Sequence, residues 1–425
     1  MTETFLHYVW QHQMLLPGLT TVDGQPVAVL QQGTPNRDAG PDFFNARLRI
    51  GEVEWAGNVE IHIHSSDWNA HRHQRDAAYN NVVLHVVYEH DTDIFLQNGR
   101  CPFTLELKPY MHPSLVANYE ALMVPPEAGI PCADRVGEVP QFLLTLFMER
   151  LAVERIEAKA GTVHRLLEES RGGWEQTCYW LLAHYFGGKV NAIPFELLAK
   201  ATDIRLLARW RDNLQRTEAL LMGQAGLLEG YFEDSYPRLL QADYEALRVG
   251  ANLRPIGSHL WKFYRMRPSS FPTIRISQFA DLVSQSKNLF DTMLQMTDVR
   301  DLQRLFNRQA APYWNDHYRF DSPCARSSVK QVGTMQADML IINAWVPLLF
   351  VFGAEHGQQQ YKDQALALLG QMRAESNAVI RQWQAVGISP GNAAESQALL
   401  QLANGYCTNR RCLECRIGYQ LLKRT

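Results

Sequence analysis

The chain has 425 residues, enough for two or three domains, and it is 46% hydrophobic and 20% charged. This composition excludes a wholly disordered chain and a collagen-like chain. The formal net charge is -3, from 41 Lys and Arg against 44 Asp and Glu, so no overall basic field indicates nucleic acid. A local basic groove is still compatible with this balance.

Three further features indicate the location of the protein and the state of its cysteines. The first residues contain no basic segment followed by an apolar run, so we expect no secretory signal and a cytoplasmic location. The longest apolar stretch, 339–354, is short for a spanning helix and contains Asn343 and Pro347, which favours a buried core helix and no membrane span. Seven thinly spread cysteines indicate reduced thiols and one candidate metal site.

The first 110 residues predict elements in the order α, β, β, β, α, β. In chain order we expect a helix over 3–15, a strand over 27–32, a hairpin of 42–50 and 52–64 turning near Gly51, a helix over 68–80, and a strand over 81–88 that is apolar on both faces. Beyond about residue 135, long segments carry apolar residues at helical spacing. The sequence therefore predicts an α+β protein, with a sheet domain over 1–130 and a mostly α-helical domain over 135–425.

Carboxylates and imidazoles are aligned along the second strand of the predicted hairpin. Alternate strand residues share a face, so Glu60, His62 and His64 should point away from the core. Asp42 opens the partner strand, and the hairpin should bring its carboxylate near Glu60. Together with the Ile61 carbonyl, two carboxylates form an oxygen-rich site suited to Mg²⁺ or Mn²⁺.

This arrangement resembles the PD-(D/E)xK nuclease superfamily, which has a restriction-endonuclease-like core in the same α-β-β-β-α-β order. Pro41 and Asp42 match its first motif, and residues 60–62 occupy the place of its (D/E)-x-K motif. The resemblance implies that Asp42 and Glu60 hold the metal and that His62 orients or activates the attacking water. His62 stands where the superfamily has Lys, so a neutral imidazole replaces a fixed positive charge.

The chain also resembles a bacterial family known only as a domain of unknown function. The phrases that carry this second resemblance are 57–62, 66–68, 79–87, 267–275 and the terminal cysteines. It implies kinship and no particular catalytic residue.

Six histidines between residues 62 and 90 invite a second kind of metal site, built from imidazoles. His85 lies within the apolar strand and is expected to be a hydrogen-bonded core residue. On a helix over 68–80, His71 and His73 do not share a face, so only one of them should reach the site. The expected supporting residues are His64, His71, Arg75 and Tyr79.

Two other groups of residues could bind a metal ion or nucleic acid. Cys407, Cys412 and Cys415 suit a tight loop around Zn²⁺ or an iron-sulfur cluster, with a fourth ligand from Cys132, Cys324 or a histidine, or they are three reduced packing residues. Cations alternate with aromatic residues over 261–275, a pattern suited to phosphates and unpaired bases or to an ordinary loop. The cations concerned are Lys262, Arg265, Arg267 and Arg275.

Metal-dependent hydrolysis of DNA or RNA is the activity that these features favour, with Asp42, Glu60 and His62 as the catalytic residues. Two alternatives remain open. One is a non-catalytic nucleic-acid-binding or scaffold protein that retains the fold. The other is a small-molecule metallohydrolase that uses the histidine cluster. A metal held by Asp42 and Glu60 supports the nuclease, whereas an all-imidazole site supports the metallohydrolase.

Overall fold

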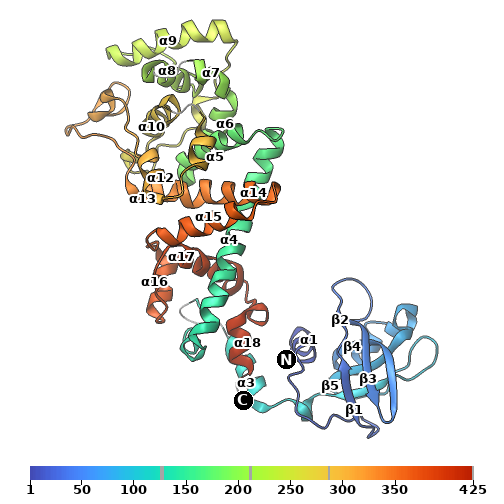
Figure 1. The fold of residues 1–425 in the computed structure, drawn as a ribbon. Helices are drawn as coiled ribbons and strands as arrows, with labels where there is room; N and C mark the ends of the chain where they lie inside the picture. The colour runs from blue at the N-terminus through green and yellow to red at the C-terminus, as the bar shows by residue number, and fades with distance from the viewer. Residues whose placement is uncertain (125–128, 210–212, 286–287, 424–425) are drawn as a thin grey trace. The chain divides into compact units, whose positions relative to one another are not determined.

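The computed structural model describes residues 1–124, 129–209, 213–285 and 288–423, which form two compact units. Unit 1 contains Met1–Phe147, Gln384–Gly387 and Leu402–Thr425, and unit 2 contains Met148–Trp383 and Ile388–Gln401. The large sheet belongs to unit 1, and unit 2 is mostly helical (Figure 1). The predicted α+β class, with an N-terminal sheet before a larger helical part, is thus confirmed.

The sheet of unit 1 has the strand order β1-β3-β4-β5-β6, with β2 pairing to β3 beside this path. Strand β3 is antiparallel to both β1 and β4, whereas β4, β5 and β6 run parallel to one another. The predicted hairpin is therefore present, and Gly51 occupies its turn with φ +61°. The strand bounds are β1 (Val27–Gln31), β2 (Thr34–Pro35), β3 (Phe43–Ile50), β4 (Val53–His64), β5 (Val82–Glu89) and β6 (Phe103–Glu106).

Both faces of the sheet are covered at β4 and β5. Residues 82–87 of β5 are all buried, as their continuous apolar pattern predicts. In β4, Glu60 is 4% exposed and His62 is 1% exposed. The expectation of a solvent-facing polar row on β4 was wrong at these two positions, because the segment after β4 folds back over them and buries Trp68 and Tyr79 with them.

Residues 67–81 form three short turns in place of the single helix expected over 68–80. They are α2 (Asp67–Ala70) and two 3₁₀ turns, His73–Arg75 and Ala77–Asn81. Arg72 has φ +66°, in the left-handed region, and this ends the helical path between the first two turns. His71 and His73 are therefore released from the helical spacing that was expected to separate them.

The other helices of unit 1 come from both ends of the chain. They are α1 (Glu3–Gln11), α3 (Pro113–Met123) and α18 (Arg416–Lys423). Helices α3 and α18 lie side by side (Figure 1). The terminal cysteine segment, which we expected in the helical domain, is thus a part of unit 1.

Unit 2 is built from helices around one apolar core. Helix α4 (Gln141–Glu169) starts in unit 1 and continues into unit 2. The helices that follow are α5 (Trp174–Phe186), α6 (Gly188–Ala201), α7 (Ile204–Arg209), α8 (Leu214–Gln224), α9 (Ser235–Ala251), α10 (Pro272–Gln285), α11 (Leu289–Leu294), α12 (Val299–Phe306), α13 (Thr334–Leu340), α14 (Val346–Glu355), α15 (Gln359–Gln371), α16 (Ala378–Ala385) and α17 (Ala393–Gln401), with a small hairpin of β7 (His317–Arg319) and β8 (Ser322–Pro323).

One continuous helical stretch, Thr334–Glu355, is long and apolar enough to cross a membrane. Within its most apolar 18-residue window, 72% is buried inside the protein. The stretch includes the π-helical turn Ile341–Trp345. This burial is the arrangement expected of a core helix.

Candidate functional site

Asp42 and Glu60 are joined by two reciprocal hydrogen bonds across the β3–β4 hairpin. The backbone N–H of Asp42 donates to Glu60 Oε2 over 3.0 Å, and the backbone N–H of Ile61 donates to Asp42 Oδ2 over 2.9 Å. The strand register explains this, because Phe43 pairs with Val59 and places the preceding and following residues beside each other. The two carboxylates named from the sequence are thus neighbours at one end of the hairpin.

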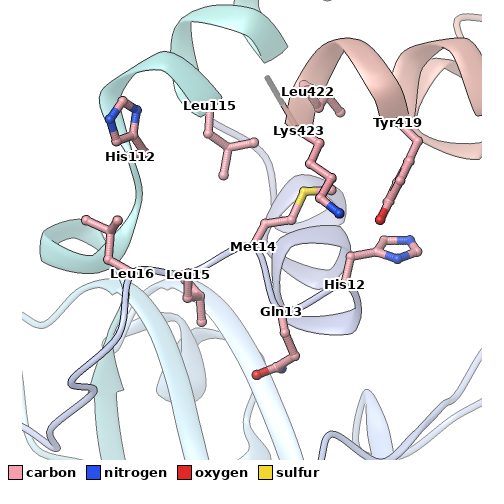
Figure 2. Close-up of a pocket in the computed structure, with 10 residues that line it drawn as sticks. All are labelled: His12, Gln13, Met14, Leu15, Leu16, His112, Leu115, Tyr419, Leu422 and Lys423. Atoms are coloured by element: carbon pink, nitrogen blue, oxygen red, sulfur yellow. The ribbon is translucent and has the colours of Figure 1, made fainter. Parts of the chain in front are cut away.

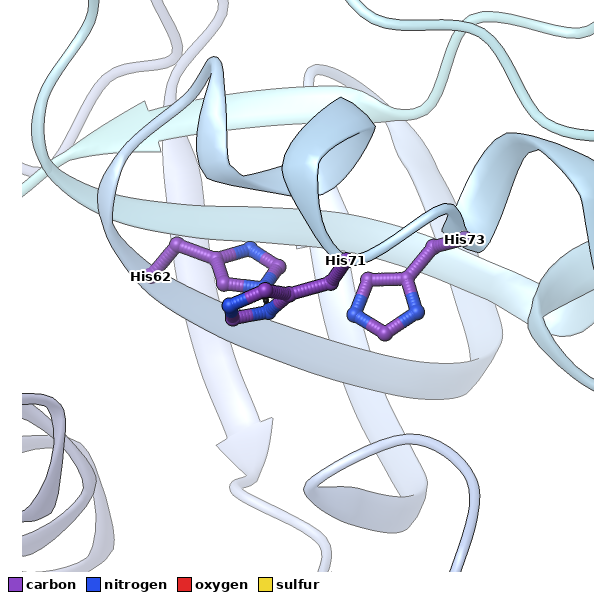
Figure 3. A group of neighbouring side chains, drawn as sticks. All are labelled: His62, His71 and His73. Atoms are coloured by element: carbon purple, nitrogen blue, oxygen red, sulfur yellow. Dashed lines mark hydrogen bonds between the residues drawn. The ribbon is translucent and has the colours of Figure 1, made fainter.

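Three imidazoles converge next to Glu60. Ligand nitrogens of His62, His71 and His73 all lie within 4.8 Å of one another (Figure 3). His73 Nε2 is 3.2 Å from Glu60 Oε1, and His62 Nε2 is 3.7 Å from the same oxygen. The expectation that only one of His71 and His73 reaches the site was wrong, because the left-handed Arg72 turns both rings inward.

The inner side of this cluster is a pair of buried histidines. His62 Nδ1 lies 2.8 Å from His85 Nε2, and His62 Nε2 lies 3.1 Å from His71 Nδ1. Burial, and then the neighbouring histidines, lower the pKa of His62 to about 2 and that of His85 to about 3. Both rings are therefore neutral near pH 7. If His62 donates from Nδ1 to His85, its Nε2 carries the lone pair that faces the cluster.

Burial raises the pKa of Glu60 above its ordinary value, and the nearby Asp42 charge adds to that shift while His73 opposes it. Tyr79 stacks on His73 with ring centroids 3.9 Å apart, and burial with the charges of Glu60 and Asp42 raises the Tyr79 pKa to about 12. A carboxylate with a raised pKa is suited to proton transfer near neutral pH. Tyr79 stays a neutral phenol that fixes the His73 ring.

Helix α1 contributes a residue that the sequence analysis missed. His7 Nε2 lies 3.2 Å from Asp42 Oδ2. Burial alone would lower the pKa of His7, but the neighbouring Asp42 carboxylate raises it overall. Nothing in the sequence links His7 to Asp42, because the contact depends on how α1 packs against the sheet. The site thus holds one imidazole with a raised pKa beside two whose pKa is lowered.

Other predicted residues lie away from this cluster. The backbone N–H of His64 donates to Asp67 Oδ2, and the exposed His64 side chain is no part of the imidazole group. Arg75 is exposed, and its carbonyl accepts a hydrogen bond from Gln97. The side chains of both are exposed, because β4 ends at His64 and Arg75 lies in the turn between His73 and Tyr79, which do belong to the site.

The predicted nucleic-acid-binding cations lie in unit 2, and one of them has a structural role. Arg275 is largely buried and donates to the amide oxygens of Gln278 and Gln336, each over 3.0 Å. Burial lowers its pKa to about 10. Both of its guanidinium NH₂ groups donate inside the unit, and its phosphate contact stays a prediction. Lys262, Arg265 and Arg267 are exposed.

A hollow of about 290 Å³ lies elsewhere in unit 1, between the end of α1 and helix α18 (Figure 2). His12, His112, Tyr419 and Lys423 supply polar atoms to its lining, and no carboxylate is among the lining residues. Proton-transfer chemistry with a carboxylate base is therefore assigned to the Glu60 cluster, which has the carboxylates.

The imidazole cluster has the donor set of a transition-metal site. Neutral imidazoles suit Zn²⁺ and other borderline cations, whereas Mg²⁺ prefers carboxylates, carbonyls and water. Because His62 is already neutral near pH 7, it can bind a cation without first losing a proton. His71, His73 and Asp42 are more exposed than His62, so the outer side of the cluster is open to solvent. We expected Asp42 and Glu60 to hold the cation. The geometry instead favours His62, His71 and His73, beside Glu60, as its ligands.

Comparisons with known proteins give one family. A family model described as "Protein of unknown function (DUF2851)" matches residues 3–378. No curated protein and no solved structure matches the chain.

Proposed function

This chain belongs to the DUF2851 family, and we propose that its unit 1 hydrolyses phosphodiester bonds in DNA or RNA with the help of a bound metal ion. The observation that carries the proposal is the convergence of Glu60 and Asp42 with three imidazoles at one end of the β3–β4 hairpin. The element order α1, β1, β2, β3, β4, α2, β5 differs from that of PD-(D/E)xK nucleases by the two-residue strand β2 and by the shortness of α2, which has only four residues, and it supports the resemblance to that extent. That resemblance supports nucleic acid as the substrate.

The residues divide into ligands and proton carriers. His62, His71 and His73 would hold the cation, and Mn²⁺ or Zn²⁺ suits them better than Mg²⁺. A bound divalent cation supplies Lewis acidity and lowers the pKa of coordinated water. Glu60, adjacent to two of the ligands, accepts the proton of the attacking water. A pKa of about 2 makes His62 a poor base, so we assign it to the ligands in place of water activation.

His7 supplies the positive charge that Lys provides in PD-(D/E)xK sites. It contacts Asp42 over 3.2 Å, and that carboxylate raises its pKa, which favours the imidazolium. An imidazolium here is placed to stabilise charge on a phosphate oxygen or to protonate a leaving oxygen. Asp42 holds His7 and, through its bond to the Ile61 N–H, the strand that carries Glu60.

A cleavage assay with the full chain tests the proposal. We expect labelled single- or double-stranded DNA or RNA to be cut in the presence of Mn²⁺ or Zn²⁺ and not in EDTA. Glu60→Gln keeps the shape of the buried side chain and should reduce the rate at least about 100-fold, the usual scale for general base catalysis. His64→Gln, an exposed change on the same strand, is the matched control and should keep full activity.

One alternative has its own supporting observation. The cation site is formed by imidazoles, which also suits hydrolysis of a small phosphate ester or another small molecule. Metal-dependent, Glu60-dependent turnover of a small phosphodiester, without cleavage of any nucleic acid, would identify this alternative. Metal binding without turnover of either substrate would identify a non-catalytic nucleic-acid-binding or scaffold protein.

A further inference from the structure

Four of the five cysteines of unit 1 are buried and lie on two segments that contact each other, apart from the histidine cluster. Cys132 follows α3, and Cys407, Cys412 and Cys415 lie between the π-helical turn Leu402–Cys407 and helix α18. Each of the four is only 8% or 9% exposed, and none of the seven forms a disulfide. Residues 275 to 283 positions apart thus contribute thiols to one region.

Arginine side chains that donate to backbone carbonyls connect the segments that carry these cysteines. Arg135, three residues after Cys132, donates to the Leu421 carbonyl of α18 over 3.5 Å. Arg410 donates to the Val124 carbonyl at the end of α3 over 2.9 Å. A Cβ on Gly418 would lie 2.0 Å from the Cys412 carbonyl oxygen, so only glycine allows α18 to pass so close to the cysteine loop. The loop is therefore tightly folded around its thiols.

The four thiols lie near enough for their charges to influence one another. Burial, and then Cys132, Cys415 and Cys412, raise the pKa of Cys407. Burial, followed by Cys415 and Cys412, likewise raises the pKa of Cys132 to about 12. Burial raises the pKa of Cys415 to about 11, and Cys412 adds to this shift. Together these effects link all six pairs of thiols.

Several groups around the thiols are suited to a negative charge. The backbone N–H groups of Ile417 and Gly418, in the first turn of α18, hydrogen-bond to the Cys415 sulfur and oppose the rise of its pKa. The positive charge of Arg410 likewise opposes the rise at Cys407 and Cys412. These N–H groups and Arg410 are the donors that would stabilise metal-bound thiolates, whereas burial keeps the metal-free thiols protonated.

We propose that Cys132, Cys407, Cys412 and Cys415 ligate an iron-sulfur cluster that joins the two ends of the chain in unit 1. Four Zn–S bonds of about 2.3 Å hold tetrahedral sulfurs only about 3.8 Å apart. Among the described residues, no three of these cysteine sulfurs lie within 4.8 Å of one another. A four-iron cluster, in which each thiolate binds its own iron, holds its sulfurs wider apart. The wider spacing and the four-cysteine set therefore favour the cluster, and Cys132 is its fourth ligand.

Metal and sulfide analysis of the full chain, purified without oxygen, tests this proposal. We expect about four iron atoms and four acid-labile sulfides per chain, with a brown colour that bleaches on reduction. Cys132→Ser should lose at least half of the iron. Cys324→Ser, a partly exposed cysteine of unit 2, is the matched control and should retain all of it.

Each other result overturns the proposal. One zinc per wild-type chain, without sulfide, would replace the cluster by a zinc site. Wild-type protein without iron after anaerobic purification and reconstitution with iron and sulfide would leave the four thiols as packing groups. Full iron content in a folded Cys132→Ser protein would exclude Cys132 as a ligand. The wild-type measurements need no variant to fold, and they do not depend on any nuclease activity at the histidine cluster.

Discussion

The buried histidines His62 and His85 make the metal-free protein sensitive to acid. Their pKa values are about 2 and about 3 in the folded state, below the ordinary value of 6.5. Between these values and pH 6.5 the unfolded chain binds more protons than the folded chain, so stability falls as the pH falls. Each such histidine contributes a slope of up to about 1.4 kcal/mol per pH unit.

We therefore predict that His85→Gln flattens the loss of stability below pH 6. Glutamine keeps a polar partner for His62 and removes one titrating group. Urea unfolding of the metal-free protein at pH 7, 6 and 5 measures the slope, with the exposed His64→Gln as control. Equal slopes for wild type and His85→Gln would contradict the folded-state pKa of His85.

Sequence reasoning identified which residues of the hairpin lie together better than it identified their burial. Asp42, Glu60 and His62 could be named because strand parity and a short turn fix which residues meet. His7 could not be named, since its contact with Asp42 depends on the packing of α1. The burial of Glu60 was also missed, because the cover over β4 comes from a segment that seemed to be one regular helix.

The backbone of Arg72 is the feature of the 67–81 segment on which the cluster depends. Its φ of +66° separates α2 from the next turn and directs His71 and His73 to one place. A left-handed conformation costs an L-residue about 1–2 kcal/mol, and glycine avoids that cost. Arginine is not a residue that favours a left-handed turn, so the sequence predicted a regular helix here.

We predict that Arg72→Gly retains metal affinity and raises the free energy of unfolding by up to about 1 kcal/mol. The β-branched variant Arg72→Val should lower the free energy of unfolding by about 1–2 kcal/mol and bind Mn²⁺ or Zn²⁺ more weakly. Calorimetric titration with each metal and chemical unfolding measure both effects. Unchanged metal affinity in Arg72→Val would show that the turn does not position the histidines.

Strands β4 and β5 approach closely at Gly57. A Cβ there would lie 2.5 Å from Val83 Cγ1 and 2.7 Å from the Asn81 carbonyl oxygen. We predict that Gly57→Ala destabilises unit 1 by about 1–3 kcal/mol, the usual cost of overpacking. Gly137→Ala, at a position with open space around it, is the control, and chemical unfolding of both compares the costs. Equal stability of the two variants would contradict the close approach.

At the scale of the molecule, the two ends of the chain complete the same unit. The last helix, α18, packs with α3 and belongs to unit 1, although more than 200 residues of unit 2 lie between them in the sequence. The sequence predicted the change from sheet to helices near residue 135, because periodicity is a local signal. It did not predict the return of the chain, because pairing of distant segments leaves no local pattern.

We predict that Leu421→Ala, in α18, increases hydrogen exchange in residues 1–124 and leaves the core of unit 2 protected. Leu421 is fully buried, and such a truncation costs about 2–5 kcal/mol. Leu349→Ala, equally buried in unit 2, is the matched control and should increase exchange there. Deprotection of both units by either variant would contradict two separately stabilised units.

Anomalous diffraction shows whether a metal ion binds between His62, His71, His73 and Glu60. Crystals grown with Mn²⁺ or Zn²⁺ and measured on both sides of the metal absorption edge locate the ion. We expect one anomalous peak about 2.0–2.2 Å from the three ligand nitrogens. A peak bound by Asp42 and Glu60 without the imidazoles, or no peak in unit 1 at saturating metal, would contradict this expectation.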